Sequence, residues 1–536
     1  MSIKAKKKFY ITTPIYYTND EPHIGHTYTT IAADVLARFH RMIGDKTFFL
    51  TGTDEHGEKN QEAAEKNGLK PKEYVDQVSA KYQMTWDLLN ISNNRFIRTT
   101  EKEHKKAVSK ALQQMYDKKY IYKGKFEGLY CKGCEQYKTE KDLVKGKCSD
   151  HKTVPVKMKE ESYMFKLSAF EKKLKKMIEK DELLIRPIEK KNEVLAFYKT
   201  GLKDISFSRS KLKWGVPLPW DPKQVSYVWP DAFLNYITGL NWDGGKTKSV
   251  RTASSGSVTT AFKDFWPADV HLMSKDIIRV HATIWPAMLL ALDLPLPKQI
   301  FVHGFFLIDG QKMSKSIGNV ISPDDLVKKY GVDGTRYLLM SATTFGHDGD
   351  ISWKWFDEKY NADLANGLGN LIARSATLAE KMEKAEIKIP ACTKRPKSNT
   401  GIKKWGGNKF DKEIIKMWKD YNNYYENIKL DSVINVILEQ QRCLDNYITA
   451  NKPWELIKNK DEKVGIIMYN ILERLRHVAL MAWPFMPETA EKIWESLGLE
   501  PSKEMEKDFK EAIKWGGLEP GTKIRKGEVL FPRIKI

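Results

Sequence analysis

The sequence predicts an α/β protein in which a parallel sheet is built in two halves, an inserted module separates the halves, and a helical bundle follows. Strand-like runs alternate with helical segments near the start of the chain and again after residue 218, as is typical of a Rossmann-type parallel sheet. A lysine-rich stretch with a cysteine cluster lies between them. From about residue 357 onward, helical periodicity dominates.

These patterns divide the chain into five predicted segments. They are the first half of the sheet domain, the insertion, the second half of the sheet domain, a linking region and the helical domain, at residues 1–118, 119–217, 218–321, 322–360 and 361–536. A chain of 536 residues is too long for one hydrophobic core, so several domains are expected.

Composition limits the class of protein. Hydrophobic residues make up 41% and charged residues 30% of the chain, and no apolar run approaches the roughly 18 residues that a membrane span needs. The first residues lack the apolar segment of a signal peptide, and five cysteines do not suit a secreted disulfide scaffold. We therefore expect a cytoplasmic protein with no membrane partner.

The formal net charge of +21 indicates an acidic partner, and nucleic acid is the leading candidate. An alternative is a lysine-rich composition without functional meaning, because lysine is spread along nearly every segment.

The first element is a strand, a tight loop and a helix. A β-branched and aromatic run from Lys8 predicts a buried strand that Pro22 ends, and helical spacing then continues to Gly44. His23 and His26 flank Gly25 at the helix start, where unpaired backbone N–H groups bind anions. A phosphate-bearing substrate is predicted, although such histidines can also be simple cap and surface residues.

A second strand, Thr47–Thr53, follows the helix, so a right-handed crossover should make it parallel to the first. It ends at Asp54, which we expect to face the same pocket as the histidines because ligands bind at the carboxyl ends of parallel strands. The charged region from Pro71 to Lys119 is predicted to be helical and shows no evident chemistry.

The insertion, from about Tyr120 to Pro217, is predicted to consist of short strands and turns. Two ligand pairs, each with two intervening residues, lie in it: Cys131 with Cys134, and Cys148 with His151. This spacing suits tetrahedral Zn²⁺, and a closed site with four protein ligands is structural. Unpaired buried cysteines are the alternative.

The second half of the sheet is predicted from three runs, Val225–Trp229, Asp269–Met273 and Gln299–Ile308, with a helix from Ile277 to Leu292. A loop from Gly310 to Gly318 follows and carries two lysines, Lys312 and Lys315, among hydroxyls and glycines. Such a cationic loop can close over a polyphosphate. Alone it would be a solvated basic turn; beside the histidine loop, phosphate binding is the better interpretation.

The carboxyl half begins at Ser322-Pro323, a helix start with a capping serine and proline at the first helical position. Helices are expected from about Asp357 to Leu497, with a polar loop near residues 394–409. Asn370 and Arg374 share a helix face, and Trp454 follows a proline at a helix start. Planar polar groups and an exposed aromatic ring suit unstacked RNA bases, although surface pairs and packed tryptophans are commoner.

His23-Ile-Gly-His26 and Lys312-Met-Ser-Lys-Ser316 are the two motifs, HIGH and KMSKS, of the class I aminoacyl-tRNA synthetases, and the chain resembles that class over essentially its full length. Further stretches resemble the methionyl-tRNA synthetase family of the bacterial type with a single zinc knuckle: Pro14–Tyr17, Thr53–Gly57, Val228–Ala232 and Phe301–Gly304. The resemblance implies a catalytic Rossmann domain, a zinc-containing connective insertion and an anticodon-binding helical bundle.

The reaction that the resemblance implies joins L-methionine to ATP as methionyl-adenylate and then transfers methionine to initiator and elongator tRNA(Met), with Mg²⁺ accompanying ATP. Because no enzyme nucleophile is required, catalysis depends on positioning and charge stabilisation. His23 and His26 would donate to phosphate oxygens, and Lys312 and Lys315 would stabilise the departing pyrophosphate. By matched position, the ATP site would also include Gly25, Asp276 and Gly304.

By the same resemblance Asp54 would bind the α-ammonium group of methionine. The pocket for the thioether would be lined by Ile15, Tyr17, Trp229, Ala232, Tyr236, Ile277, His281 and Trp285. Each of these aromatic residues could instead belong to the core. The anticodon CAU would be read by Asn370, Arg374 and Trp454.

The chain departs from the family pattern at Pro230, Phe233 and Met273-Ser274, which bears on pocket shape and ribose contacts. An apolar pocket discriminates weakly against one missing methylene, so homocysteine is expected to be activated as well.

Three other functions fit the sequence less well. A synthetase for valine, isoleucine or leucine would need a larger inserted editing domain. A catalytically silent tRNA-binding paralogue would not need both phosphate motifs, and a nucleotidyltransferase acting on a cofactor precursor would not need the helical half. We expect a monomer, because no further tRNA-binding domain follows the bundle.

Overall fold

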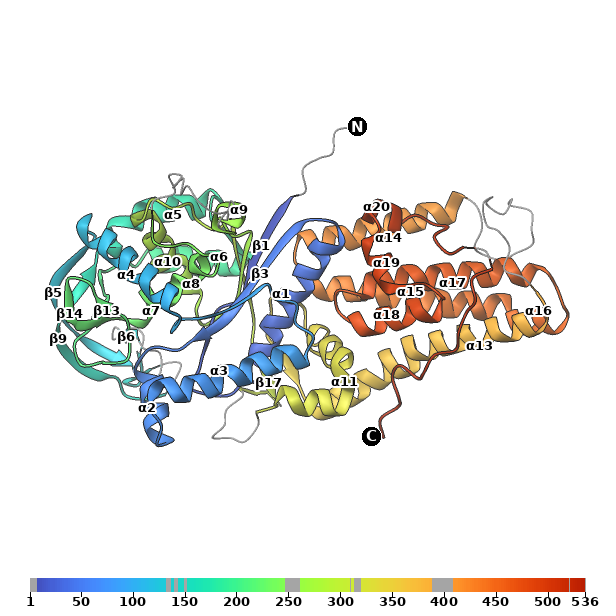
Figure 1. The fold of residues 1–536 in the computed structure, drawn as a ribbon, viewed down its shortest axis with the longest axis horizontal. Coiled ribbons are helices and arrows are strands. Elements are labelled where there is room, and N and C mark those ends of the chain that lie inside the picture. The colour runs from blue at the N-terminus through green and yellow to red at the C-terminus, as the bar shows by residue number, and fades with distance from the viewer. Residues whose placement is uncertain are drawn as a thin grey trace, which may run out of the picture.

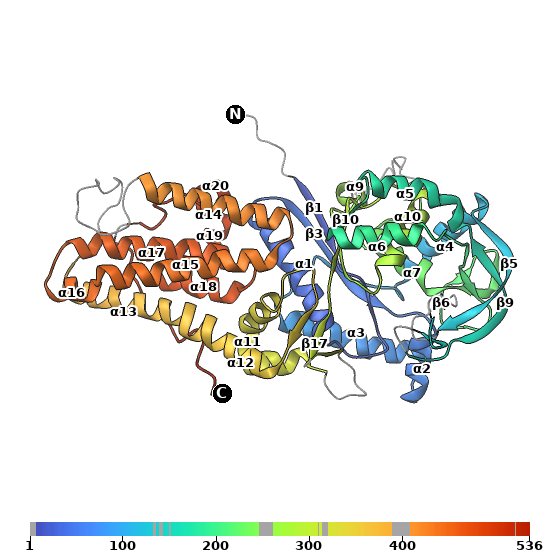
Figure 2. The ribbon, with the colours of Figure 1, turned by 180° about the vertical axis from the view of Figure 1, so that it is seen from behind.

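The computed structural model describes most of the chain, in the segments 7–131, 136–138, 143–148, 152–245, 261–308, 310–312, 320–387, 408–519 and 521–535. The molecule is elongated (Figure 1). The sheet domain and the inserted module form one end and a helical bundle forms the other, with the strands β1 and β3 and helix α1 between them. The view from behind shows the same arrangement (Figure 2).

A seven-stranded sheet organises the first end of the molecule, in the order β10-β16-β15-β1-β3-β2, with β4 paired to β3. All of its pairings are parallel. The strands are β1 Lys8–Thr12, β2 Tyr16–Tyr17, β3 Lys46–Asp54, β4 Arg95–Arg98, β10 Leu184–Arg186, β15 Val270–Ser274 and β16 Gln299–His303. Because β1 lies between β3 and β15, the sheet grows in opposite directions from it, and the crevice at its carboxyl end is where such sheets bind ligands.

Helix α1, Ile24–Met42, has the predicted extent and connects the parallel strands β1 and β3 as expected. The strand before it is shorter than the prediction: β1 ends at Thr12, and only Tyr16 and Tyr17 pair again with β3. Pro14 explains the interruption, since proline has no N–H to donate to a strand ladder.

The prediction that Val225–Trp229 is a strand of the main sheet is wrong. β14, Asp221–Ser226, pairs antiparallel with β12 Ser208–Arg209 and β13 Pro217–Leu218 in a small separate sheet, and helix α7 begins at Val228. Pro230 is compatible with this helix because it lies in the first turn, where the N–H has no helical partner. Short helices α8 Asn235–Thr238 and α9 Ala261–Phe265 follow.

The other two predicted strands, β15 and β16, pair with each other in the main sheet, and helix α10, Ile278–Ala291, lies between them in sequence as predicted. The last predicted run breaks at Gly304. β17 Phe306–Ile308 instead forms a small sheet with β18 Gln311–Lys312 and β19 Gly349–Ile351. A Cβ atom at Gly304 would lie 2.3 Å from the carbonyl carbon of His347, so only glycine fits this backbone crossing.

The insertion matches its prediction only in part. An antiparallel sheet in the order β11-β9-β5-β6 dominates its first portion. Helices α5 and α6 follow, however, and β10 returns to the main sheet beside β16. The elements of this region are β5 Ile121–Cys131, β6 Gln136–Lys138, β7 Leu143–Val144, β8 Lys147–Cys148, β9 Val156–Phe165, the 3-10 turn Leu167–Phe170, α5 Glu171–Glu179, α6 Ile188–Tyr198 and β11 Ile205–Ser206.

The region from Pro71 to Lys119 is mainly helical, as predicted, but it contains strand β4. Its helices are α3 Pro71–Leu88 and α4 Lys102–Asp117, and helix α2, Glu58–Lys66, lies just before it.

The carboxyl half is a helical bundle, as predicted. The first helix, α11 Pro323–Met340, is capped by Ser322, whose Oγ accepts the backbone N–H of Asp325 at 3.1 Å. The remaining helices are α12 Trp353–Lys359, the π-helical segment Tyr360–Gly369, α13 Asn370–Lys384, α14 Asn408–Glu426, α15 Leu430–Asn451, α16 Pro453–Lys458, α17 Lys463–Ala482, α18 Pro487–Ser496, α19 Pro501–Glu506 and α20 Phe509–Ala512. Within the described segments, no helix is both long and apolar enough to cross a bilayer.

A buried ion pair joins the two ends of the molecule. Asp34 on α1 and Arg336 on α11 are both fully buried, and the Arg336 Nη2 lies 2.7 Å from Asp34 Oδ2. Arg336 also donates to the carbonyl oxygens of Pro484 and Phe485 in the bundle, at 3.0 and 2.8 Å. Burial alone would raise the pKa of Asp34, but Arg38 and Arg336 lower that pKa to about 2. The helix that carries the histidine motif is thereby fixed to the bundle.

Candidate active site

The two histidines of the first motif stack at the start of α1, with ring centroids 3.8 Å apart. His23 is the N-cap residue, and its Nδ1 accepts the backbone N–H of Gly25 at 3.0 Å. The Nδ1 of His26 accepts the backbone N–H of His23 at 3.3 Å. Because an amide N–H can only donate, both Nδ1 atoms are acceptors, and each neutral ring carries its proton on Nε2.

His26 is held in the neutral form. Burial lowers its pKa well below the usual range, and the neighbouring His23 lowers that pKa further. The Tyr82 hydroxyl lies 3.2 Å from its Nδ1, and the ring of Tyr16 packs 4.8 Å from its ring. The start of α1 therefore offers neutral imidazole N–H donors beside the positive end of the helix dipole.

Asp54 and Tyr17 are partners in the sheet, because β2 pairs with β3 in the register Tyr17 to Asp54. Asp54 is buried, and its backbone carbonyl accepts hydrogen bonds from the backbone N–H of Thr18 at 3.3 Å and from Asn60 Nδ2 at 2.9 Å. Tyr17 is half-buried and the Lys59 ammonium lies 5.2 Å from its ring centre. Both predicted residues thus lie at the carboxyl end of the sheet, as expected.

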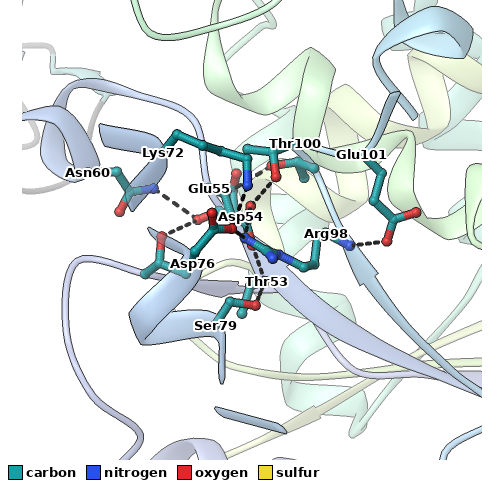
Figure 3. A network of polar contacts seen from close by, with 12 residues as sticks. Thr53, Asp54, Glu55, Asn60, Lys72, Asp76, Ser79, Arg98, Thr100 and Glu101 are labelled. Atoms are coloured by element: carbon teal, nitrogen blue, oxygen red, sulfur yellow. Dashed lines mark hydrogen bonds and ion pairs between the residues drawn. The ribbon is translucent and has the colours of Figure 1, made fainter. Parts of the chain in front are cut away.

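A polar network fixes the strand end that carries Asp54 (Figure 3). The fully buried carboxylate of Glu55 receives two hydrogen bonds from Arg98 on β4, Nε at 2.5 Å and Nη2 at 3.0 Å. It also accepts from the hydroxyls of Thr53, at 2.8 Å, and Thr100. Arg98 in turn pairs with Asp76 on α3. The sequence assigned no role to Glu55 or Arg98, because these partners are distant in the chain.

The aromatic residues predicted to bind the substrate side chain come together around α7, α8 and α10. Trp229 stacks on Phe233 at 5.5 Å and Phe233 on Trp285 at 5.9 Å, while Tyr236 packs 5.6 Å from Trp285. His281 meets the face of Phe233 edge-on at 5.0 Å. Phe233, noted in the sequence only as a departure, thus lies between the two tryptophans.

The smaller predicted pocket residues surround this group. Ile15, before β2, and Ile277, the N-cap residue of α10, are partly buried against the same core cluster as Trp229. Ala232 is buried on α7 next to Phe233.

Hydrogen bonds set the orientation of these rings. His281 donates from Nδ1 to the carbonyl of Ile277 at 2.9 Å, so its Nε2 accepts the Tyr236 hydroxyl at 2.8 Å. Burial lowers the pKa of His281 to about 4, which keeps it neutral. Trp285 donates from Nε1 to His271 Nε2 at 3.2 Å. His271, on β15, is a further buried residue that the sequence did not single out.

The residues predicted to lie near adenosine are placed at the ends of β15 and β16. Asp276 is exposed just beyond β15 and accepts a hydrogen bond from Ser274. Gly304 follows β16, and its carbonyl accepts His303 Nδ1–H at 2.8 Å. The Nε2 of His303 accepts the Thr29 hydroxyl of α1 at 2.7 Å, so the two predicted phosphate and adenosine regions are in contact.

The second motif is described only at its first lysine. Lys312 pairs with Leu307 through the backbone of β18, which places the start of the loop beside β17. Its side chain and the whole of Lys315 lie outside the described residues.

Half of the predicted zinc site is described. Cys131 and Cys148 are both buried, and Thr153 contacts both: its Oγ1 lies 3.9 Å from Cys131 Sγ, and its carbonyl accepts the Cys148 N–H at 2.8 Å. Cys134 and His151 lie outside the described residues. Within the described part of the chain, no group of three or more possible metal ligands is found.

The predicted RNA-binding residues lie in the bundle, away from the sheet (Figure 1). The Arg374 guanidinium on α13 lies 5.3 Å from the ring centre of Trp454 on α16, and the Trp454 side chain is 38% exposed. Asn370 is exposed one turn before Arg374 on the same helix. The structure therefore brings a cation and an exposed aromatic ring together on one surface.

Comparisons with known proteins agree with this layout. The profile of the family "tRNA synthetases class I (M)" matches residues 9–154 and 138–376, and that of the anticodon-binding domain of tRNA ligases matches residues 408–526. A methionine–tRNA ligase of Clostridium acetobutylicum is 44% identical, over 100% of this chain and 79% of its own length. One of Streptomyces coelicolor is 40% identical, over 99% of this chain and 98% of its own length.

Solved structures are similar over nearly the whole chain. The methionyl-tRNA synthetase of Mycobacterium tuberculosis in complex with methionyl-adenylate superposes with a TM-score of 0.87 at 34% identity, covering 98% of this chain and 100% of that one. The ligand-free form of the same enzyme superposes with a TM-score of 0.81 at 30% identity and covers 100% of each chain.

Proposed function

This chain belongs to the methionine-specific class I tRNA synthetases, and from that premise we propose which of its residues carry out each part of the reaction. Its activity is that of a methionine–tRNA ligase, which consumes ATP with Mg²⁺. The site assignment is supported by the strand order of one parallel sheet. Asp54 ends β3, the histidine pair follows β2, and α10, which carries His281 and Trp285, follows β15.

The first step forms methionyl-adenylate. A carboxylate oxygen of methionine attacks the α-phosphorus of ATP, a new phosphorus–oxygen bond forms, and the bond to pyrophosphate breaks. The Nε2–H groups of His23 and His26 donate to phosphate oxygens as negative charge shifts. Lys312 and Lys315 neutralise the departing pyrophosphate. In the second step a terminal hydroxyl of tRNA attacks the activated carbonyl, and AMP leaves.

Methionine is bound by two parts of the pocket. Asp54 pairs with its ammonium group, and the cluster of Trp229, Phe233, Tyr236 and Trp285 surrounds the thioether, which packs well on aromatic rings. Neutral His281 accepts the Tyr236 hydroxyl and so keeps that ring in place. Ile15, Tyr17, Ala232 and Ile277 complete the apolar wall.

Amino-acid-dependent exchange of labelled pyrophosphate into ATP tests the assignment to methionine. We expect methionine to support exchange, homocysteine to support it more weakly, and valine, isoleucine and leucine to support little. Exchange with another apolar amino acid, but not with methionine, would refute the assignment.

Asp54→Asn tests the ammonium contact. The neutral amide keeps the shape of the side chain but loses the charge-assisted interaction, so the KM for methionine is expected to rise by about 10- to 100-fold. The KM for ATP is expected to stay unchanged. Asp76→Asn is the matched control, because Asp76 belongs to the adjacent network but is half-exposed on α3. A methionine KM equal to that of the wild type would contradict the assignment.

A structural zinc ion completes the inserted module in this proposal. Two buried thiols that share the neighbour Thr153 supply half of a tetrahedral donor set, and Cys134 and His151 would supply the other half. The ion would hold β5, β7 and β8 together.

Metal analysis tests the zinc proposal. We expect about one zinc per purified chain, and Cys148→Ser is expected to lower this content while the bundle keeps its helical circular dichroism. Cys443→Ser, on α15, serves as the control. A zinc content far below one per wild-type chain would contradict the proposal.

Transfer RNA is bound through the helical domain, and Asn370, Arg374 and Trp454 are the proposed readers of the CAU anticodon in initiator and elongator tRNA(Met). A cytoplasmic monomer with the five segments predicted above completes the proposal.

A further inference from the structure

A buried histidine–aspartate–histidine group lies next to the methionine pocket but takes no part in the proposed chemistry. Asp231, on α7, is 1% exposed, and each of its carboxylate oxygens meets a different histidine. Oδ2 lies 2.6 Å from Nδ1 of His56, and Oδ1 lies 3.0 Å from Nε2 of His104 on α4. The Nδ1 of His104 lies 2.7 Å from the hydroxyl of Thr238 on α8.

The hydrogen-bond directions follow from the carboxylate. Burial alone would raise the pKa of Asp231, but His56 and His104 hold that pKa well below the usual range, so the group is ionised and can only accept. His56 therefore donates from Nδ1 and His104 from Nε2. The remaining nitrogen of His104 can then accept the Thr238 hydroxyl. A buried charge is thus satisfied by two donors from separate elements.

These contacts connect the two halves of the pocket. His56 is two residues beyond Asp54, and Asn60 Nδ2 donates to the carbonyls of both, at 2.9 Å for Asp54 and 3.0 Å for His56. Asp231 is on the same short helix as Trp229 and Phe233. The His56–Asp231 hydrogen bond is therefore a direct link between the strand end that carries the ammonium-binding carboxylate and the helix that carries the thioether-binding rings.

A second contact fixes the His56 side of this link. The ring of Trp214 lies 5.4 Å from that of His56 and meets it edge-on, and Trp214 Nε1 donates to the Glu55 carbonyl at 2.5 Å. Main-chain contacts and ring packing thus restrain His56 independently of its hydrogen bond to Asp231. Helix α7 has only six residues, so its own hydrogen bonds stabilise it weakly. The hydrogen bonds that Asp231 accepts from His56 and His104 therefore contribute more to the position of this helix.

We propose that His56 and Asp231 are positioning residues that set the spacing between Asp54 and the aromatic pocket, and hence the affinity and side-chain selectivity for methionine. The inference rests on the proposed assignment of Asp54 and the α7 rings to methionine. Neither residue needs to touch the substrate. Loss of the link should affect methionine far more than ATP, because the link joins the end of β3 to α7, whereas the proposed ATP residues belong to α1 and to the ends of β15 and β16.

The test measures KM for methionine and for ATP separately by pyrophosphate exchange in the full-length chain. His56→Ala and Asp231→Asn are each expected to raise the methionine KM about tenfold and to leave the ATP KM within about twofold. His56→Asn should restore most of the affinity, because its Nδ2 can occupy the position of the histidine Nδ1 and donate to Asp231. The ratio of methionine to norleucine activation should fall in parallel.

Two further variants separate positioning from stability. Val108→Ala leaves a cavity in the same core, on α4 one turn after His104, while the His56–Asp231 hydrogen bond is kept, and should lower Tm while both KM values stay unchanged. The double variant His56→Ala with Asp231→Asn should cost no more methionine affinity than either change alone, since both break one link.

The outcomes distinguish this inference from the proposed function. If the wild type shows no methionine-dependent exchange, the proposed function fails. If the wild type is active but the two KM values rise together in His56→Ala, or if His56→Asn gives no recovery, the positioning inference is refuted while the function stands. Should Asp231→Asn fail to fold, the His56 pair of variants decides the question alone.

Discussion

Replacing His26 by alanine is expected to lower the rate of methionyl-adenylate formation by about 10²–10³-fold, the usual cost of removing one preorganised donor from a site that stabilises developing charge. The geometry explains why the effect should be this large. The Nδ1 of His26 is used by the His23 backbone N–H, which leaves Nε2–H as the donor, and burial keeps the ring neutral. The donor is therefore present at neutral pH without any change of protonation.

Single-turnover formation of adenylate at saturating ATP and methionine measures this effect. His26→Gln is the informative partner, because its amide can accept the backbone N–H and still donate, and should keep part of the rate. His40→Gln is the control: it changes a histidine at the far end of the same helix, where the ring stacks on Phe9. If His26→Ala formed adenylate at the wild-type rate, the role of this histidine would have to be abandoned.

Trp454→Ala is expected to reduce kcat/KM for tRNA charging by roughly ten- to a hundredfold, since a base stacked on an aromatic ring contributes about 1–3 kcal/mol. Pyrophosphate exchange without tRNA should be unchanged, because Trp454 lies on α16 in the bundle and the exchange reaction uses only the sheet domain (Figure 1). The guanidinium of Arg374 lies over this ring, so Arg374→Ala should likewise reduce tRNA charging and leave pyrophosphate exchange unchanged.

The control is Trp454→Phe, because phenylalanine keeps an aromatic ring of smaller area at this position. Trp454→Phe should recover most of the charging activity. A tRNA(Met) transcript with an altered anticodon should be charged poorly by the wild type, and Trp454→Ala should discriminate less between this transcript and the natural one. An equal loss of exchange and charging in Trp454→Ala would instead indicate a folding defect and would argue against an anticodon role.

The sequence predicted those parts of the fold that depend on local patterns. Helix α1 and strands β3, β15 and β16 carry clear periodicity and punctuation, and all lie where expected. Strands β4 and β10 are too short, at four and three residues, to show a periodicity that would predict them. The run Val225–Trp229 is apolar and β-branched enough for a strand, but its packing against α4 and α10 favours a helix from Val228.

The candidate site was predictable to the extent that its residues lie in short motifs. His23, Asp54 and Trp229 each belong to such a motif, and the structure brings their elements to one edge of the sheet. Contacts between residues that are distant in the chain gave no signal, even where one partner belongs to a motif. Glu55 is 43 positions from Arg98, and His303 is 274 positions from Thr29, so no spacing rule relates them. Phe233 was visible only as an unusual residue, and its place between Trp229 and Trp285 depends on tertiary packing.

The arginine at position 336 has a consequence for experiments that divide this protein into parts. Its partners come from α1 on one side and from the carbonyls of residues 484 and 485 on the other. A fragment cut between the sheet domain and the bundle would keep the guanidinium and lose its carbonyl acceptors, leaving buried donors open to solvent or unsatisfied. Catalytic fragments made by truncation are therefore expected to be less stable than the full chain for a reason unrelated to tRNA, and activity lost on truncation does not by itself measure communication with the anticodon.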